Sequence, residues 1–291
     1  MTAVAVAAGA EGGAEAAAGT EDGRAEGRNV TIRVGVFGAG GRMGTTVAHA
    51  ISAEPDLELV AAIDPSYEGI DVGEVTGIAG VHFAVSSDPG PAVSAGVEVM
   101  VDFTHLAAAR ANLQFCAANR IHAVVGTSGF TERDHEQIAE LFTHSNCLIA
   151  PNFAIGAVLM MRFAEMAAPY FDRAEIIELH HDGKIDSPSG TAISTAERMA
   201  SASARWEADP VTNQTIEGAR GAKGPAGIPI HSVRMRGMTA HQEIILGTAG
   251  QTLTIRHDSI DRSSFMPGVV MAVRRIRSLP GLTVGLDRLL D

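Results

Sequence analysis

Two histidines and a lysine stand close together in the segment IELHHDGKIDSPSGTA, residues 177–192. His180 and His181 are followed by Lys184 and then by a Pro-Ser-Gly-Thr turn. Histidine exchanges protons near neutral pH, and lysine attracts anions. If residues 191–204 form a helix, its first N–H groups add another anion site. The segment therefore predicts a cationic site for a small dicarboxylate beside a proton-transferring histidine.

A metal site is the competing interpretation of the same segment. His180, His181 and Asp182 all carry atoms that bind metals. Neighbouring residues of a strand point in opposite directions, however, and Lys184 would repel a cation. No cysteine or second histidine cluster lies at ligand spacing. We therefore expect no bound metal.

A glycine-rich segment, GAGGRMG at residues 38–44, lies between a predicted strand and a predicted helix. Its spacing is G-x-x-G-x-x-G, and glycines at such a turn let the backbone approach a pyrophosphate at the helix N-terminus. Asp64 ends the next predicted strand, where a carboxylate accepts hydrogen bonds from the ribose of a dinucleotide. Thr45 and Thr46 follow Gly44, so the Lys-Ser/Thr pair of a P-loop is missing. Together the loop and Asp64 predict dinucleotide binding.

The acidic residue favours NADH over NADPH. A 2′-phosphate would meet the like charge of Asp64, and Pro65 and Ser66 provide no cation to offset it. Arg42 is a nearby cation that would permit NADPH. Use of NADH, NADPH or both therefore stays open.

The elements that must position these residues change in kind along the chain. Up to Asn152, apolar runs alternate with helical stretches, which is typical of a parallel sheet covered on both faces. Strands are predicted at 32–37, 57–64, 97–103, 121–126 and 147–150, and helices at 42–52, 107–119 and after Thr131, whose side chain is a suitable N-cap. Beyond Asn152 the prediction is helices at 156–171, 191–204 and 265–279 and strands at 174–180, 229–235, 242–247 and 251–257.

The predicted fold class is α/β: a Rossmann-type dinucleotide-binding domain with a parallel sheet, and a smaller α+β substrate domain with a mixed sheet. We expect a disordered tail at 1–29, the dinucleotide-binding domain at 30–152, the substrate and oligomerisation domain at 153–262, and a C-terminal helix segment at 263–291 that returns to the first domain. Within these elements, His241, Glu243, His257 and Asp258 are expected to be exposed on the sheet, and Val158, Met161 and Met166 to be helix core.

Composition limits the partners. The 291 residues carry a formal net charge of −12, so the chain as a whole repels nucleic acid. No apolar run reaches the roughly 20 residues of a membrane span, and the N-terminus has no basic region typical of a secretion signal. Cys116 and Cys147 lie far apart, as expected for buried thiols in a reducing compartment. We expect a cytoplasmic protein that binds neither nucleic acid nor membrane.

These motifs together resemble the 4-hydroxy-tetrahydrodipicolinate (dihydrodipicolinate) reductase family, from about Ile32 to Leu290. The similarity rests on GAGGRMG (38–44), VDFTH (101–105), VVGTSGF (124–130), APNFAIG (150–156), ELHHDGKIDSPSGTA (178–192) and IRHDSIDRSSFMPGV (255–269). The resemblance implies reduction of a cyclic imine dicarboxylate with NADH or NADPH, on the route to diaminopimelate and lysine. It also implies a two-domain subunit that assembles into a homotetramer through the sheets of the second domain.

The resemblance implies a role for each site residue. The pyrophosphate would be held by Gly38, Ala39, Gly40, Gly41, Arg42 and Met43 and the ribose by Asp64, while Gly126, Thr127, Ser128, Ala150, Pro151, Asn152 and Phe153 would border the nicotinamide. His180 matches the proton donor/acceptor and Lys184 a second proton donor. His181, Gly190 and Thr191 match contacts to the substrate carboxylates, with Ser189 beside them.

The sequence departs from the family pattern at two places. Asp182-Gly183 stands where relatives often have a basic residue, and Pro65 stands where relatives that prefer NADPH have a basic one.

Three other functions remain to be separated from this one. A semialdehyde dehydrogenase would need a nucleophilic cysteine. An amino-acid dehydrogenase would act on keto acids with ammonia, and a regulator would bind NADH without turnover.

Overall fold

The computed structural model describes residues 31–290. Residues 31–290 belong to one compact unit. The expectation made for residues 1–29 lies outside the described part of the chain. No helix within residues 31–290 combines the length and the apolar character that crossing a membrane requires.

The first sheet is parallel throughout and contains the predicted strands. Its strands are β1 (Ile32–Phe37), β2 (Leu57–Ile63), β3 (Val99–Asp102), β4 (His122–Val125), β5 (Cys147–Ile149) and β11 (Leu282–Val284). They lie in the order β11-β5-β4-β3-β1-β2, with each neighbouring pair parallel. The order of the strands reverses between β1 and β3. In such sheets ligands bind at this switch point, beyond the carboxyl ends of the strands.

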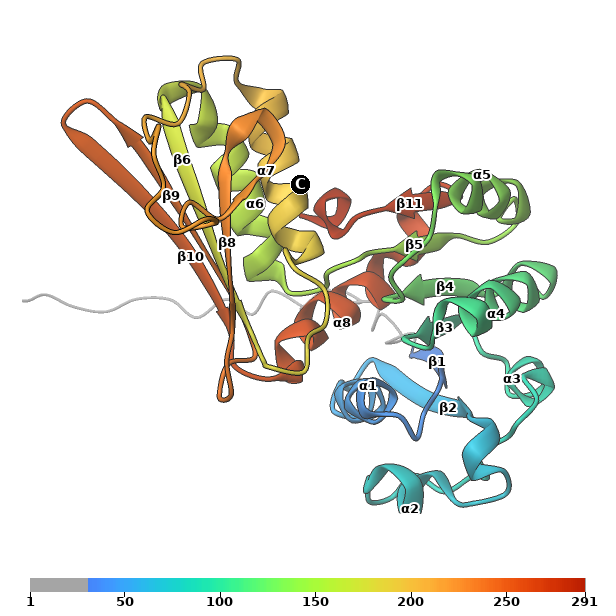
Figure 1. Ribbon diagram of the computed structural model, residues 1–291. Helices are drawn as coiled ribbons and strands as arrows, with labels where there is room; N and C mark the ends of the chain where they lie inside the picture. Colours follow the sequence, from blue (N-terminus) through green and yellow to red (C-terminus); the bar gives the residue numbers. More distant parts are fainter. Residues whose placement is uncertain (1–30, 291) are drawn as a thin grey trace, which may run out of the picture. The chain divides into compact units, whose positions relative to one another are not determined.

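Helices cover both faces of the first sheet (Figure 1). The side chains of α1 (Arg42–Ser52) and α8 (Met266–Arg275) share one apolar cluster with Val34, Val36 and Val124 of the strands. The opposite face packs α4 (Leu106–Ala118) and α5 (Glu132–Leu141) against a second cluster that contains Met100 and Val125. Burial on both faces explains why these strands are nearly all apolar.

Short elements complete this region. Two helices, α2 (Val72–Thr76) and α3 (Gly90–Ser94), were not predicted, nor was the 3-10 turn η1 (Pro65–Tyr67). The cap expected at Thr131 is confirmed: its hydroxyl bonds the Asp134 N–H, and the Asp134 carboxylate bonds back to the Thr131 N–H, forming a capping box.

The second sheet is mixed, as predicted. It contains β6 (Arg173–His180), β7 (Ala222–Lys223), β8 (Pro229–Arg234), β9 (Ala240–Thr248) and β10 (Gln251–Ser259), in the order β10-β9-β6-β8-β7. Strands β6 and β8 are parallel, and the other pairs are antiparallel. Helices α6 (Ile155–Ala167) and α7 (Gly190–Ala202) lie along this sheet in Figure 1. Ile176, Ile244 and Met199 are buried between the sheet and these helices.

The remaining 3-10 turns are η2 (Ala168–Tyr170), η3 (Pro225–Gly227), η4 (Arg262–Phe265), η5 (Ile276–Ser278) and η6 (Leu286–Leu289). The helix predicted at 265–279 ends earlier, at Arg275, and β11 follows it, pairing with β5. Strand β11 was missed because it has only 3 residues between Gly281 and Gly285. One core assignment was wrong: Val158 and Met161 are buried, but Met166 is 68% exposed on the outer face of α6.

Candidate active site

The glycine loop has the close backbone contacts that only glycine permits. Gly38 has φ of +67°, a conformation that side chains disfavour. A Cβ added to Gly44 would lie 1.9 Å from the Gly38 carbonyl oxygen, so helix α1 starts in direct contact with the loop. The N-cap residue Gly41 has no side chain to bond the first N–H groups of α1. These groups are therefore available to an anion such as a pyrophosphate.

Asp64 is folded against this loop. Its carboxylate accepts hydrogen bonds from the Gly40 N–H and from the Ser66 N–H, each at 3.0 Å. The residue is only 8% exposed, and each of its oxygens keeps a lone pair for a further donor. The ring of Tyr67 packs against Gly40. The structure thus brings together the two parts of the predicted dinucleotide motif.

The loops that follow β3, β4 and β5 gather at the switch point. Thr127 donates its hydroxyl to the Thr104 carbonyl at 2.7 Å, and the Thr104 side chain lies beside Gly38. The Phe103 ring packs between Gly126 and Phe153, with the two phenyl centroids 5.6 Å apart. The predicted nicotinamide segments, residues 126–128 and 150–153, therefore lie at one edge of the sheet with the glycine loop.

Some predicted cofactor residues are covered and others face solvent. Buried or half-buried residues are Gly38, Ala39, Gly40, Met43, Gly126, Thr127, Ala150, Asn152 and Phe153, whereas Gly41, Arg42, Ser128 and Pro151 are exposed. Exposure of Arg42 at the start of α1 leaves its guanidinium free to reach a ligand phosphate.

His180 ends strand β6, as predicted, and its ring is held by a carboxylate. Its Nδ1 lies 2.5 Å from Oε2 of Glu178, a residue with no exposed surface. Alternation along the strand places Ile176, Glu178 and His180 on the same face. A carboxylate cannot donate, so Nδ1 carries the proton and Nε2 is the free nitrogen of the neutral ring.

Arg234 of β8 balances the buried carboxylate. It lies opposite His180 in the parallel register and donates two hydrogen bonds of 2.9 Å to the two oxygens of Glu178. The same guanidinium donates to the carbonyls of Lys184 and Asp186. A buried charge is tolerated when it is paired and hydrogen-bonded in this way. Arg234 therefore fixes both Glu178 and the loop that carries Lys184.

The charges around His180 act in opposite directions. Burial lowers the pKa of His180 most, the Glu178 carboxylate raises it, and Lys184 and Arg234 lower it, for a net pKa below the usual value. Burial alone would raise the pKa of Glu178, but bonds from Arg234, Ser232 and His180 outweigh that effect and lower it. The free site therefore favours a neutral imidazole beside an ionised carboxylate.

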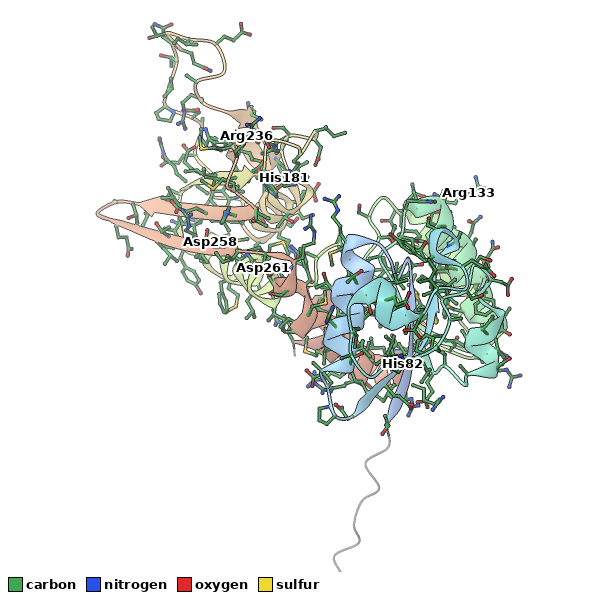
Figure 2. All side chains as sticks on the ribbon, turned by 90° about the horizontal axis from the view of Figure 1, so that it is seen from below. His82, Arg133, His181, Arg236, Asp258 and Asp261 are labelled. Atoms are coloured by element: carbon green, nitrogen blue, oxygen red, sulfur yellow. The ribbon has the colours of Figure 1, made fainter. Side chains whose placement is uncertain are left out.

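Acidic side chains pair with the lysine and arginine side chains around the loop of residues 181–189. The Lys184 Nζ lies 2.7 Å from both oxygens of Asp186, and it lowers the pKa of that carboxyl. His181 is exposed at the surface (Figure 2), and the neighbouring Asp182 pairs with Arg236 at 2.9 Å. The site is therefore less positive than the sequence suggested, and an incoming anion competes with Asp186 for Lys184.

The start of α7 has the unpaired N–H groups on which the predicted anion site depends. Ser189 is the N-cap: its hydroxyl oxygen accepts the Ala192 N–H, and its own N–H donates to Glu178. The first helical N–H groups, those of Gly190 and Thr191, have no acceptor within the helix. A Cβ added to Gly190 would have no atom within 4 Å, so this side of the helix start is open.

One pocket joins several of these groups. Its lining consists of Asn152, Ala157, Met160, His180, Ser189, Thr191, Ala240, His241, Gln242, His257, Ser259 and Phe265. Asn152 belongs to the segment predicted to border the nicotinamide, and its side chain caps Ala154 at 2.9 Å. The turn η4, which ends in Phe265, contacts α1, the helix that begins in the glycine loop. The pocket therefore connects His180, the predicted proton-transferring residue, with the predicted cofactor side.

Two sheet histidines were wrongly expected to be exposed. His241 has a side chain only 11% exposed, with Nδ1 against Asp258 and Nε2 accepting the Thr239 N–H. The ring of His257 packs over Gly156 at the start of α6. His257 is covered because α6 packs over its face of the sheet, and His241 is covered because Asp258 and the Thr239 N–H hold its ring. Alternation along the strands reveals neither contact.

Sequence reasoning also missed Glu178 and Arg234. A signal for Glu178 was present, since an acidic residue on the apolar face of a predicted strand needs a buried partner. Arg234 had no such signal, because its place beside His180 depends on the pairing of β6 with β8.

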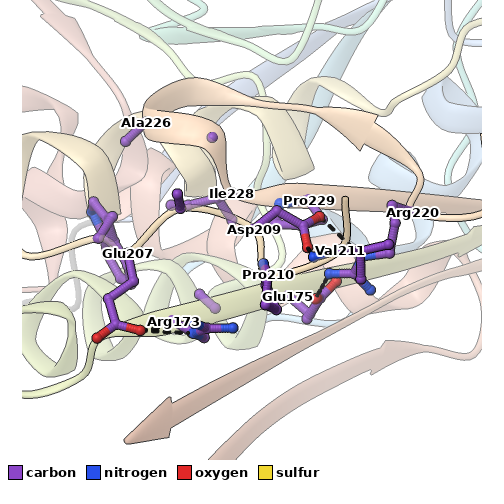
Figure 3. A pocket seen from close by; sticks show the side chains of 14 residues that line it. Arg173, Glu175, Glu207, Asp209, Pro210, Val211, Arg220, Ala226, Ile228 and Pro229 are labelled. Atoms are coloured by element: carbon purple, nitrogen blue, oxygen red, sulfur yellow. Dashed lines mark hydrogen bonds and ion pairs between the residues drawn. The ribbon is translucent and has the colours of Figure 1, made fainter. Parts of the chain in front are cut away.

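A second cavity lies apart from this chemistry, under the loop between α7 and β8 (Figure 3). Its charged side chains pair with one another: Arg173 bonds Glu207, and Arg220 bonds Glu175 and Asp209. The indole N–H of Trp206, which also lines the cavity, is buried without a partner among the described residues. Because both arginines are already neutralised, this cavity is a poor site for an anionic substrate.

Within residues 31–290, no group of three His, Cys, Asp or Glu side chains is arranged to hold a metal ion. Cys116 and Cys147 are both buried, and burial raises the pKa of each thiol. A thiol that stays protonated is a weak nucleophile, which argues against semialdehyde-type catalysis.

Comparison with known proteins gives a consistent result. The model of the dihydrodipicolinate reductase N-terminus matches residues 32–153, and that of the C-terminus matches residues 156–290. A 4-hydroxy-tetrahydrodipicolinate reductase from Corynebacterium urealyticum is 49% identical, over 89% of this chain and 98% of its own. One from Mycolicibacterium vanbaalenii is 48% identical, over 89% and 99%.

Solved structures agree. A dipicolinate-bound dihydrodipicolinate reductase from Paenisporosarcina sp. superimposes with a TM-score of 0.77 at 39% identity, covering 89% of this chain and 99% of its own. An amine dehydrogenase from Mycobacterium smegmatis has a TM-score of 0.59 at 15% identity, over 88% of this chain and 95% of its own, a similarity that shows the fold alone.

Proposed function

The chain belongs to the dihydrodipicolinate reductase family, and we propose that His180, Lys184 and the start of α7 carry out that family's reaction. The protein is an oxidoreductase that acts on a CH–CH group. It reduces 4-hydroxy-tetrahydrodipicolinate, by way of dihydrodipicolinate, to tetrahydrodipicolinate in the biosynthesis of diaminopimelate and lysine. The reductant is a pyridine nucleotide.

The residues of the glycine loop suit this reductant. Gly38 to Met43 would hold the pyrophosphate with backbone N–H groups, and Asp64 would accept bonds from the ribose hydroxyls. Residues 126–128 and 150–153 would border the nicotinamide ring. When bound, the cofactor supplies the hydride. The chain's part is to hold the substrate ring at that position and to exclude water.

We propose a preference for NADH. Asp64 puts a negative charge at the ribose, and the residues after it, Pro65, Ser66 and Tyr67, carry no positive charge. Arg42 is exposed at the start of α1 and would allow some use of NADPH. Steady-state rates with each cofactor at matched concentrations test this, and equal or better kcat/KM with NADPH would contradict it.

The substrate's two carboxylates would bind at the mouth of the pocket. The N–H groups of Gly190 and Thr191 and the Lys184 ammonium offer donors for them, while Ser189 shapes the turn. The exposed His181 would contact a carboxylate from the loop side. To bind a substrate carboxylate, the Lys184 ammonium would first separate from Asp186, which lies on the same short loop.

His180 would deliver the proton. The 4-hydroxy substrate first loses water to give the unsaturated imine. Hydride addition at C4 of that imine leaves negative charge along the imine–enamine system, which must be protonated. An approaching dianion favours the imidazolium form of His180, and Glu178 stabilises that form through Nδ1. Nε2 would then carry the transferred proton. The single observation that carries this proposal is a pocket shared by His180, Thr191 and Asn152.

Replacing His180 tests the assignment. His180→Gln should reduce turnover by about 100-fold or more with little loss of NADH binding. Unchanged turnover would refute the role of His180. NADH oxidation with freshly made 4-hydroxy substrate, but not with keto acids plus ammonia, separates this activity from an amino-acid dehydrogenase. A regulator that only binds NADH would show neither.

We further propose that the subunits form a homotetramer through the second sheet and act in the cytoplasm, with a domain division at 30–152, 153–262 and 263–291. The face of this sheet opposite α6 and α7 supports the assembly, since it carries the half-buried apolar residues Ile177, Leu179, Val233 and Ile245. Sedimentation of the purified protein tests it, and a monomer at micromolar concentration would contradict it.

A further inference from the structure

Gln242 of β9 is a polar side chain held in one orientation deep beside His180. The residue is 4% exposed, and its Nε2 donates a 2.8 Å bond to the Thr195 hydroxyl. Thr195 donates its own proton to the Thr191 carbonyl at 2.7 Å, so it can only accept from Gln242. The amide group therefore cannot be turned round, and its Oε1 is the atom directed elsewhere.

The Oε1 of Gln242 is buried without a hydrogen-bond partner among the described residues. A buried acceptor left without a donor destabilises the folded chain, so an unpaired amide oxygen calls for a donor from outside the chain. Gln242 lines the same pocket as His180 and Thr191. The residue that carries the unpaired acceptor thus lines the pocket where the substrate is proposed to bind.

The register of the strands gives the position of Gln242 relative to His180 in the sheet. Gln242 is opposite Glu178 on β6 and opposite His257 on β10, and His180 lies one row nearer the end of the strand. Burial and His241 lower the pKa of His257 while Asp258 raises it, for a net lowering. Met160 and Phe265 add apolar lining to the pocket, and the Glu178 carboxylate, which Arg234 balances, lies in the same row as Gln242. Such surroundings suit a neutral hydroxyl better than a carboxylate.

We propose that Gln242 is a further substrate-binding residue, whose Oε1 accepts a hydrogen bond from the ring hydroxyl of the hydroxylated substrate. The inference rests on the proposed function and adds a specificity element to it. The ring carboxylates are ionised acceptors, so the hydroxyl is the donor the substrate offers. Gln242 selects the hydroxylated ring over a planar dicarboxylate that has no donor.

Calorimetric binding in the presence of NAD⁺, which permits no turnover, tests this with two ligands. Freshly prepared 4-hydroxy-tetrahydrodipicolinate has the hydroxyl, and dipicolinate lacks it. Gln242→Met keeps the side-chain length and removes the acceptor. We expect its Kd for the hydroxy ligand to rise about tenfold, while the Kd for dipicolinate changes less than about twofold. The exposed Gln251→Met on β10 is the matched control and should change neither constant.

An equal change in both constants would overturn the inference, because Gln242 would then only shape the pocket. No change in either would overturn it too, since a bound water would be satisfying Oε1. If Gln242→Met does not fold, Thr195→Val frees the amide, and the ratio of the two constants should still rise; a constant ratio would count against the inference. Failure of the proposed function is seen separately, as wild-type protein that binds both ligands but does not oxidise NADH.

Discussion

The Nδ1 of His180 lies 2.5 Å from Oε2 of Glu178, and Glu178 is in turn bound by both terminal nitrogens of Arg234. Glu178 and Arg234 therefore have opposite effects on the pKa of His180. The Glu178 carboxylate fixes the imidazole tautomer and stabilises the imidazolium, while Arg234 offsets part of the charge of the carboxylate. In the proposed mechanism, Glu178 and Arg234 together set how readily His180 takes up the proton that it would deliver.

Glu178→Gln should move the pH dependence of the reaction. Glutamine keeps the size of the side chain but removes the charge that favours the imidazolium, so the pKa of His180 should fall further. The decline of kcat/KM with rising pH, which reports the free enzyme, should therefore begin at lower pH. If the pKa of His180 falls by about 1, kcat/KM measured at a fixed pH above the decline should fall about tenfold.

The charged and titratable groups that face His180 are Glu178, Lys184 and Arg234, with His257 also lining the pocket. Glu175→Gln is a matched control, because Glu175 is on the same strand but pairs with His231 and Arg220. A pH profile that stays in place in Glu178→Gln while thermal stability falls would show that Glu178 has only a structural role.

The sequence predicted most of the features that depend only on residues close together in the chain. The glycine loop, Asp64, the end of β6 at His180 and the cap at Thr131 each depend on residues within one or two elements. Arg234 and Gln242 could not be placed beside His180 and Glu178 in this way, because their positions follow from the register of β8 and β9 against β6. The pairing of Lys184 with Asp186 depends on a loop conformation that residue types do not specify.

Gly44→Ala should damage the cofactor site and the fold together. The new methyl group would lie 1.9 Å from the Gly38 carbonyl oxygen, so the loop or α1 must shift. We expect the free energy of unfolding to fall by about 1–3 kcal/mol and NADH binding to weaken. Urea denaturation and cofactor titration measure both.

Gly247→Ala is the control for that substitution, since a Cβ there has no atom within 4 Å. Its free energy of unfolding should stay within about 1 kcal/mol of the original. If Gly44→Ala proves no more harmful than Gly247→Ala, the close contact between α1 and the glycine loop is not needed.

Three histidines have lowered pKa values in the folded protein, so we expect the protein to lose stability on mild acidification. Burial is the largest cause that lowers the pKa of His122, His180 and His257 below the usual 6.5. The unfolded chain therefore binds protons first, so stability is complete above about pH 6.5 and falls as the pH drops through that value towards the folded pKa values. Urea denaturation at pH 8 and at pH 5.5 measures the difference.

The carboxylates contribute in the same direction but at lower pH, because their unfolded pKa values are near 4. His257→Gln should reduce the loss of stability between pH 8 and pH 5.5. An equal free energy of unfolding at both pH values in the original protein would contradict the prediction.

Asp186 should limit substrate affinity, because it holds Lys184 at 2.7 Å in the free protein. Asp186→Asn keeps the shape of the side chain and removes the charge that competes with a substrate carboxylate. We expect the KM for the 4-hydroxy substrate to fall about two- to fivefold, as for an exposed ion pair of about 0.4–1 kcal/mol. Asp182→Asn, which frees Arg236 instead, should have a smaller effect.

Lys184→Ala gives the complementary result, a higher KM and a lower kcat. Because Asp186 acts through Lys184, the double variant Lys184→Ala/Asp186→Asn should show little of the gain that Asp186→Asn produces alone. Additive effects in this cycle would mean that Asp186 repels the substrate directly. An unchanged or higher KM in the single variant Asp186→Asn would show that the ammonium group of Lys184 does not bind the substrate carboxylate.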